Sequence, residues 1–170
     1  MAYGMTPLRM DTLRPHLAGA KRVAVLGIGS TLRGDDVAGR LAAAAFRQAW
    51  RAARRAPRVV VFLGETAPEN LTGEIRRFRP SHLIMLDAAD MGREPGCVER
   101  IPADRTVANS AMSTHSLPLR MLGEYLRDSG VGEVVIVGIQ PLSCEFGKEP
   151  SDAVRAAARE VAAALMRSLE

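Results

Sequence analysis

The sequence of 170 residues predicts an α/β fold, a three-layer α/β/α sandwich with a central, mostly parallel sheet of about five strands. Two patterns predict it. Short apolar runs bounded by glycine or proline alternate with stretches in which apolar residues recur every three or four positions. The runs are typical of strands buried on both faces, and the periodic stretches are typical of helices that cover a sheet. Their alternation indicates parallel strands joined by helices.

The predicted elements follow one another without an internal repeat or a linker. Strands are expected at residues 22–27, 58–63, 82–86, 97–101 and 133–139. Helices are expected at residues 38–49, 66–78, 118–127 and 151–165. Thr66 and Glu69 have the spacing of a capping box, and Ser151 can cap the last helix. Residues 102–113 are expected to form a loop.

Composition narrows the classes of function. With 47% hydrophobic and 25% charged residues, the chain has the make-up of a globular protein. Residues 1–20 lack the apolar core of a secretory signal, and no apolar run is long enough to cross a bilayer. Cys97 and Cys144 form no CxxC motif, and a disulfide is disfavoured in a reducing cytosol. We expect a cytoplasmic protein without a membrane anchor.

The net charge of +4 and a cluster of arginines between residues 47 and 58 favour a nucleic-acid partner at first sight. The arginines fall at the end of a predicted helix, however, where cations complement the helix dipole on an ordinary solvated surface. Aromatic residues make up only 4% of the chain, which leaves little to stack on bases. We expect no nucleic-acid partner.

A glycine loop follows the first predicted strand. It does not fit the dinucleotide fingerprint, because Leu32 stands where the third glycine is required, and no Walker lysine follows. Asp35 and Asp36 would also repel a bound phosphate. We expect Asp35 to cap the start of the next helix, and we keep Asp36 as a candidate metal ligand.

Three polar residues are expected near the carboxyl edge of the sheet, where sites in α/β proteins gather. Asp36 follows the glycine loop, Asp87 ends the third strand, and His115 precedes a helix. Each has a plainer interpretation, since Asp87 can form an Asx turn and a single loop histidine is more often structural. Serines beside His115 suggest a serine hydrolase, but no G-x-S-x-G motif accompanies them. Together, two carboxylates and an imidazole suit a transient or catalytic divalent metal.

Five segments carry a family resemblance: VLGIGSTLRGDD (25–36), TAPEN (66–70), LDAADMGREPG (86–96), STHSLPL (113–119) and VGIQP (137–141). In this order they resemble the hydrogenase maturation peptidases, most closely the branch that serves hydrogenase 3 of the formate hydrogenlyase type. The likeness spans residues 22–168. A single peptidase domain is therefore expected at residues 21–170, after an N-terminal extension, residues 1–20, that is a candidate for disorder. Ser30 departs from the usual asparagine of the loop but can still cap its turn.

The resemblance implies a monomeric α/β/α endopeptidase, of a family classed as aspartic-type. It would remove a C-terminal extension from the large-subunit precursor of a nickel-iron hydrogenase after nickel insertion. By motif, the family's metal-contacting positions fall on Asp36, Asp87 and His115. The nickel would arrive with the client, so no tightly held metal of the enzyme's own is expected. Two alternatives stay open, a nickel-sensing maturation chaperone that does not cut, and a nucleotide-binding α/β domain.

Overall fold

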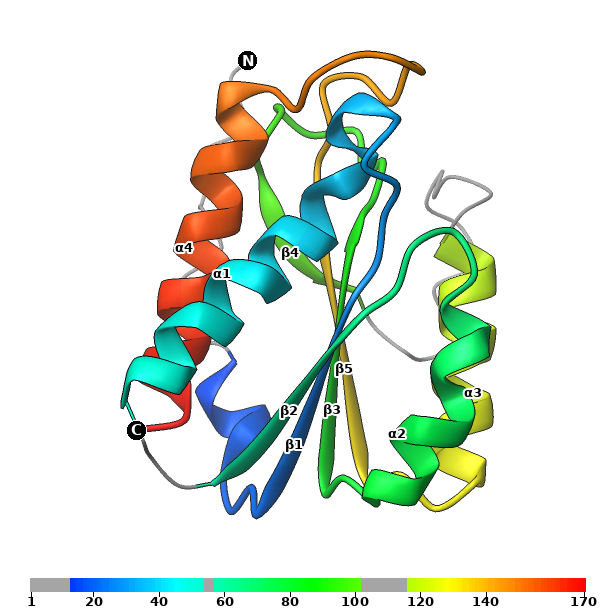
Figure 1. Cartoon of the computed structure of the whole chain (residues 1–170), viewed down its shortest axis with the longest axis vertical. Coiled ribbons are helices and arrows are strands. Elements are labelled where there is room, and N and C mark those ends of the chain that lie inside the picture. Colours follow the sequence, from blue (N-terminus) through cyan, green and yellow to red (C-terminus); the bar gives the residue numbers. More distant parts are fainter. Residues whose placement is uncertain (1–12, 54–56, 102–115) are drawn as a thin grey trace.

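The computed structural model describes residues 13–53, 57–101 and 116–170 of the chain. Its centre is one sheet of five strands in the order β2-β1-β3-β5-β4 (Figure 1). The strands are β1 (Arg22–Gly27), β2 (Arg58–Leu63), β3 (His82–Ala88), β4 (Val98–Ile101) and β5 (Glu133–Ile139). The first three and β5 are parallel, and β4 runs antiparallel to β5 at the edge. The predicted five-stranded, mostly parallel sheet is confirmed.

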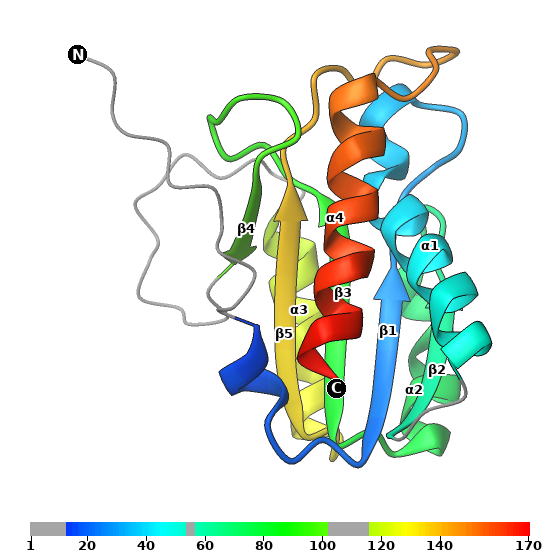
Figure 2. The same cartoon turned by 90° about the vertical axis from the view of Figure 1, so that its left-hand side faces the viewer.

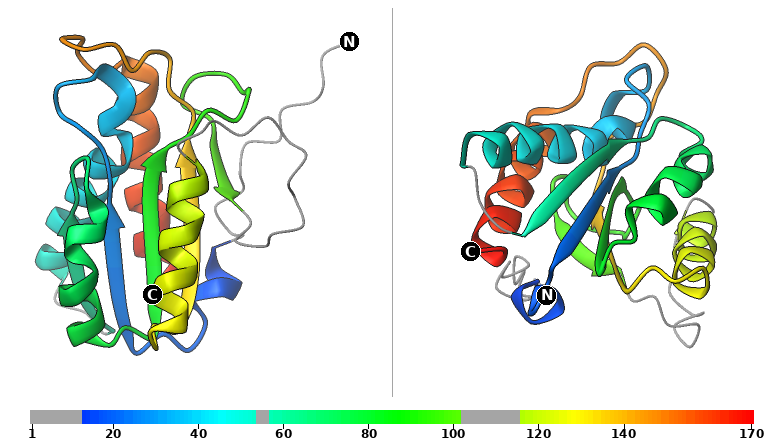
Figure 3. Two further views of the ribbon diagram at one scale, coloured as in Figure 1. Left: turned by 90° about the vertical axis from the view of Figure 1, so that its right-hand side faces the viewer. Right: turned by 60° about the horizontal axis from the view of Figure 1, so that its bottom comes forward.

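Helices cover both faces of the sheet. The helices α1 (Ala38–Ala53) and α4 (Asp152–Ser168) lie on one face (Figure 2). The helices α2 (Thr72–Phe78) and α3 (Ser116–Asp128) lie on the other (Figure 3). Successive side chains of a strand pack into the cores on opposite faces of the sheet. Val25 packs with α1 and α4, whereas Leu26 packs with α2. This alternation is why the strands read as unbroken apolar runs in the sequence.

The carboxyl ends of the parallel strands meet at one edge of the sheet. Gly27, at the end of β1, pairs with Leu63 of β2 and with Leu86 of β3. On the other side of β3, Asp87 pairs with Gly138 of β5. The third strand extends through Asp87 to Ala88, so Asp87 belongs to the sheet. Its backbone is thereby fixed.

The segment predicted as one helix at residues 66–78 is two pieces. A 3-10 helix, η4 (Pro68–Leu71), leads into α2, and no side-chain hydrogen bond caps η4. The predicted capping box is therefore wrong. Proline near the start of η4 supplies the fixed φ, and Thr72 donates its hydroxyl hydrogen bond back to the Glu69 carbonyl. The predicted Ser151 cap is confirmed, because the Ser151 hydroxyl accepts a hydrogen bond from the Val154 amide.

Part of the proposed N-terminal extension belongs to the folded domain. Residues 14–17 form a 3-10 helix, η2 (Arg14–Leu17), and the side chains of Leu13 and Leu17 are buried in the core with α1 and α4. The domain therefore includes residues 13–20 as well as the predicted residues from 21 onward. In the part of the chain that the structure describes, no helix has the length and apolarity that a membrane span requires.

Candidate active site

A cleft of about 1150 Å³ lies at the carboxyl edge of the sheet. Its walls come from the glycine loop after β1, residues 65–72 after β2, the end of β3, helix α3 and the loop after β5. Carboxylates dominate its charged lining: Asp36, Glu65, Glu69, Asp87 and Asp90. Among the described lining residues Arg33 is the one cation, and Glu65 is also paired with Arg40 at 2.8 Å. The cleft thus favours a cation or a positively charged group.

Asp87 is the most perturbed acid of the cleft. Burial and, to a smaller extent, the negative charge of Asp36 raise the pKa of Asp87 to about 7, although a hydrogen bond with the Ala88 backbone opposes the rise. Partly buried carboxylates that repel one another are typical of sites built for a cation or for proton transfer. The structure therefore brings Asp36 and Asp87 together at the carboxyl edge of the sheet, where both were expected.

Asp36 sits in a short 3-10 helix, η3 (Gly34–Val37), which precedes α1. Its Oδ2 atom accepts a hydrogen bond of 2.9 Å from the Ser30 amide, so the carboxylate is turned back over the glycine loop. The loop passes close beneath it, because a Cβ atom at Gly29 would lie 1.9 Å from the Asp36 carbonyl oxygen. The Ser30 hydroxyl accepts a hydrogen bond from the Leu32 amide, which confirms the predicted turn cap.

Asp35 has a different task from the one predicted. Its carboxylate is buried and accepts hydrogen bonds from the amides of Leu142, Ser143 and Ser151 at 2.7, 3.4 and 2.6 Å. The Ser151 hydroxyl donates a fourth, at 2.8 Å. The expectation that Asp35 caps its own helix is therefore wrong, because amides of the loop after β5 occupy the carboxylate. Asp35 ties that loop to the glycine loop.

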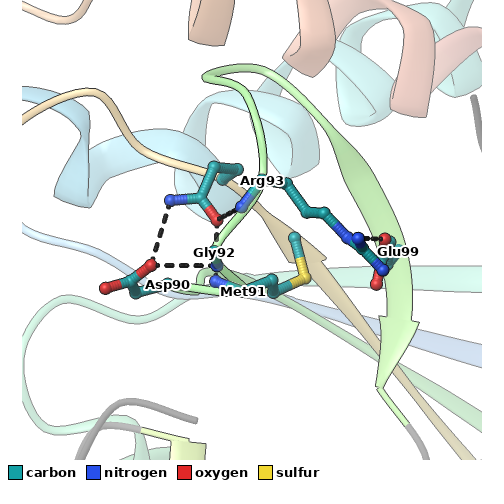
Figure 4. A network of polar contacts seen from close by, with 6 residues as sticks. Asp90, Met91, Gly92, Arg93 and Glu99 are labelled. Atoms are coloured by element: carbon teal, nitrogen blue, oxygen red, sulfur yellow. Dashed lines mark hydrogen bonds and ion pairs between the residues drawn. The ribbon is translucent and has the colours of Figure 1, made fainter. Parts of the chain in front are cut away.

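Gln140 organises the turn after β3, a role that was not predicted from the sequence. Its Oε1 atom accepts hydrogen bonds from the Met91 and Arg93 amides, and its Nε2 atom donates to Asp90. Asp90 also accepts from the Gly92 amide at 3.2 Å (Figure 4). The Asx turn that was considered for Asp87 is thus made by Asp90. The sequence offered one signal for this role, a glutamine directly after an apolar strand, and the structure shows that Gln140 is buried.

Cys144 also lines the cleft and was not singled out from the sequence. Burial, together with the negative charges of Asp36 and Asp35, raises the pKa of the Cys144 thiol to about 11. A thiol in this environment stays protonated at neutral pH, so it is a poor nucleophile. The cleft therefore favours chemistry based on its carboxylates rather than on a cysteine.

His115 lies outside the described residues, so its place in the site stays a prediction. The next residue, Ser116, begins α3, and Leu119 and Leu122 of that helix line the cleft. Among the residues that the structure does describe, no group of three or more His, Cys, Asp and Glu is arranged to hold a metal ion. Asp36 and Asp87 therefore need another donor to complete a metal site.

The fold and the cleft define a class: an α/β protein with paired carboxylates, suited to a cation, at the carboxyl edge of a mostly parallel sheet. A family model described as hydrogenase maturation protease matches residues 46–168. The chain belongs to the hydrogenase maturation protease family, and it is a hydrolase. The match includes the positions of Asp87 and His115, whereas Asp36 lies before it.

Individual relatives agree with the family. The hydrogenase 3 maturation protease of Escherichia coli K12 is 39% identical over 121 residues, which cover 69% of this chain and 71% of the relative. The crystal structure of a [NiFe] hydrogenase maturation protease from Thermococcus kodakarensis has a TM-score of 0.79 at 31% identity, covering 93% and 98% of the two chains. The solution structure of an endopeptidase from Escherichia coli has a TM-score of 0.70 at 32% identity, covering 84% and 87%.

Proposed function

We propose that this chain removes the C-terminal extension of a nickel-iron hydrogenase large-subunit precursor after nickel insertion. In this proposal Asp36, Asp87 and His115 contact the nickel that the precursor carries, so that the metal is part of the substrate. The family supports the protease activity, and the name of the Escherichia coli relative supports hydrogenase 3 as the type of client. The paired carboxylates of the cleft support the contact with a metal.

The observation that carries the proposal is the coupling of Asp36 and Asp87. Both carboxylates line one cleft, and the charge of Asp36 contributes to the raised pKa of Asp87. A divalent cation between them would replace this repulsion with attraction. Two carboxylates without a thiolate hold free divalent ions weakly. Nickel that the precursor already binds needs only the remaining ligands of its coordination sphere. The proposal therefore includes no tightly held metal in the isolated enzyme.

Two chemical routes are compatible with this arrangement. Nickel in the precursor can polarise the scissile carbonyl as a Lewis acid, or it can lower the pKa of a nearby water molecule. In either route a carboxylate of the Asp36–Asp87 pair can accept the proton that the attacking water releases. The reacting peptide would lie in the same cleft.

The location and the assembly state are parts of the proposal. We infer a cytoplasmic location, where hydrogenase precursors would be met before export or assembly, and a reducing compartment suits Cys97 and Cys144, which are both free thiols. We also infer that the enzyme acts as a monomer, because the cleft is built from the elements of one chain.

The nucleotide-binding alternative is disfavoured by the glycine loop. The Ser30 amide, which would face a phosphate, is hydrogen-bonded to the Asp36 carboxylate. Gly29 is required for close packing against the chain's own backbone rather than for the approach of a ligand. The wall of the cleft nearest this loop is acidic, which opposes a polyphosphate.

Intact-mass measurement distinguishes the protease from the chaperone. A nickel-loaded large-subunit precursor is incubated with the wild-type enzyme, with Asp87→Asn and with Asp36→Asn. We expect the wild type to shorten the precursor by the mass of one C-terminal peptide, and both variants to leave it intact while they still bind it. A precursor of unchanged mass in complex with the wild-type protein would instead establish the chaperone.

A further inference from the structure

Several large apolar side chains of the described residues are exposed in or beside the cleft. Among the described residues, the exposed large hydrophobic side chains are those of Leu32, Met121, Tyr125, Leu142 and Phe146. Met121, Tyr125 and Leu142 line the cleft. Leu32 and Phe146 lie on the two loops beside it, at 61% and 72% exposure. Apolar side chains scattered singly need no explanation, but a group at the mouth of a cleft is typical of a binding surface.

Leu32, Leu142 and Phe146 lie on two adjacent loops beside the cleft, and we call these three residues the apolar rim. Its two loops run together, since the Gly147 amide donates a hydrogen bond of 2.8 Å to the Leu32 carbonyl. The Gly34 amide likewise donates to the Lys148 carbonyl, at 3.0 Å. Figure 1 shows the loop that precedes α4 lying over the start of α1. The rim therefore combines segments that are more than 100 residues apart in the sequence.

The backbone beneath the rim is held firmly. The buried carboxylate of Asp35 accepts hydrogen bonds from Leu142 and from both the amide and the hydroxyl of Ser151. The Asp35 amide in turn donates to the Ser143 carbonyl at 2.9 Å. A binding surface that is already ordered loses little conformational entropy when a partner binds. The rim is thus preorganised for contact.

Charge does not favour a strongly acidic or basic partner at the rim. Lys148 and Glu145 on the same loop form an ion pair of 3.9 Å, and Arg33 and Glu149 have opposite charges. The rim is continuous with the cleft, because Leu142 belongs to both. A folded substrate that places a chain segment between Asp36 and Asp87 therefore comes close to the rim.

We propose that the apolar rim is the docking surface for the folded body of the hydrogenase large-subunit precursor, while the precursor's nickel and scissile segment occupy the cleft. This inference rests on the proposed function for the identity of the partner. The rim supplies affinity through Leu32, Leu142 and Phe146, and the carboxylates supply the reaction. Contacts at the rim therefore govern KM rather than kcat.

The test uses the full chain with Leu32 and Phe146 both changed to Gln, which leaves the lining of the cleft unchanged. Binding is measured by surface plasmon resonance with nickel-free precursor, and cleavage kinetics are measured with nickel-loaded precursor. We expect Kd and KM to rise by about tenfold or more and kcat to change by less than about twofold. Phe146→Leu, which keeps an apolar side chain, should retain most of the affinity. The matched control is Ala163→Gln on the exposed side of α4, which should behave as the wild type.

Several outcomes would overturn the docking surface. Unchanged Kd and KM in the double variant would do so, as would equal weakening by Ala163→Gln. A wild-type dimer that the double variant breaks would make the rim a contact between copies of this chain. If the double variant unfolds, Leu32→Gln and Phe146→Gln are measured singly against the same criteria. A wild type that binds but never cleaves would refute the proposed function alone, because Kd still decides the role of the rim.

Discussion

Gly39 of α1 lies directly against the strand that carries Asp87. A Cβ atom at residue 39 would lie 1.9 Å from the Leu86 carbonyl oxygen and 2.7 Å from the Cα atom of Asp87. This close approach seats the start of α1 on β3, and Asp36 precedes Gly39 by about one helical turn. The charge of Asp36 reaches Asp87 because a residue without a side chain stands at this contact.

Gly39→Ala is therefore expected to disturb both the fold and the site. Overpacking at a contact with backbone costs about 1–3 kcal/mol or more in the free energy of unfolding. Urea denaturation measures this loss. The matched control is Gly73→Ala in α2, where an added Cβ would meet nothing within 4 Å. That variant should be as stable as the wild type or about 0.5–1 kcal/mol more stable. Equal effects of the two changes would contradict the close packing of α1 on β3.

Asp87→Asn is expected to stabilise the isolated protein at neutral and alkaline pH. The pKa of Asp87 is about 7 in the folded chain, against an ordinary value of 3.8. Between these values the unfolded chain has released its proton and the folded chain has kept it, so the contribution of Asp87 to stability falls as pH rises. The resulting loss in the free energy of unfolding is complete above about pH 7 and amounts to about 2–4 kcal/mol. An asparagine at residue 87 avoids this loss, because its side chain stays neutral.

The check is urea denaturation of the wild type and Asp87→Asn at several pH values. The two proteins should be equally stable near pH 4, and the variant should gain an advantage that levels off above about pH 7. As a control, Asp36→Asn should lower the pKa of Asp87, measured from its carboxyl carbon by NMR, because one source of repulsion is gone. A variant less stable than the wild type at pH 8 would mean that the Asp87 charge supports the fold.

Substitution of Asp35 should mainly reduce stability, whereas substitution of the neighbouring Asp36 should mainly abolish cleavage. Asp35→Ala removes a buried carboxylate that accepts four hydrogen bonds, and we expect a loss of about 3 kcal/mol or more in the free energy of unfolding. Asp36→Ala removes one such hydrogen bond, from Ser30, and should cost about 1 kcal/mol or less. Cleavage should nevertheless be abolished in Asp36→Ala. Similar losses of stability in both variants would show that Asp36 is structural too.

The purified enzyme should contain almost no metal. The described residues that line the cleft offer carboxylates and a protonated thiol, which bind free divalent ions weakly. Elemental analysis by mass spectrometry after gel filtration should find well under one nickel or zinc per chain. A stoichiometric ion that survives a chelator would identify a conventional metalloprotease.

The sheet and the meeting of Asp36 with Asp87 could be predicted from the sequence because both follow from local signals. Apolar runs mark the strands, and parallel strands carry the residues at their carboxyl ends to one edge. The role of Asp35 could not be predicted, because its partners Leu142 and Ser151 are 107 and 116 residues away along the chain. Leu13 and Leu17 were missed because a 3-10 helix of four residues has no apolar periodicity to read. His115 falls outside the described residues.

The central claim is that the nickel is delivered by the precursor and is required for cleavage. The most direct measurement mixes metal-free wild-type enzyme with nickel-loaded and with nickel-free precursor at equal concentrations, and follows the cleaved fraction by intact mass. We predict complete cleavage of the loaded precursor and none of the nickel-free precursor, however much enzyme is added. Efficient cleavage of nickel-free precursor would contradict the claim, because Asp36 and Asp87 would then act without the client's metal.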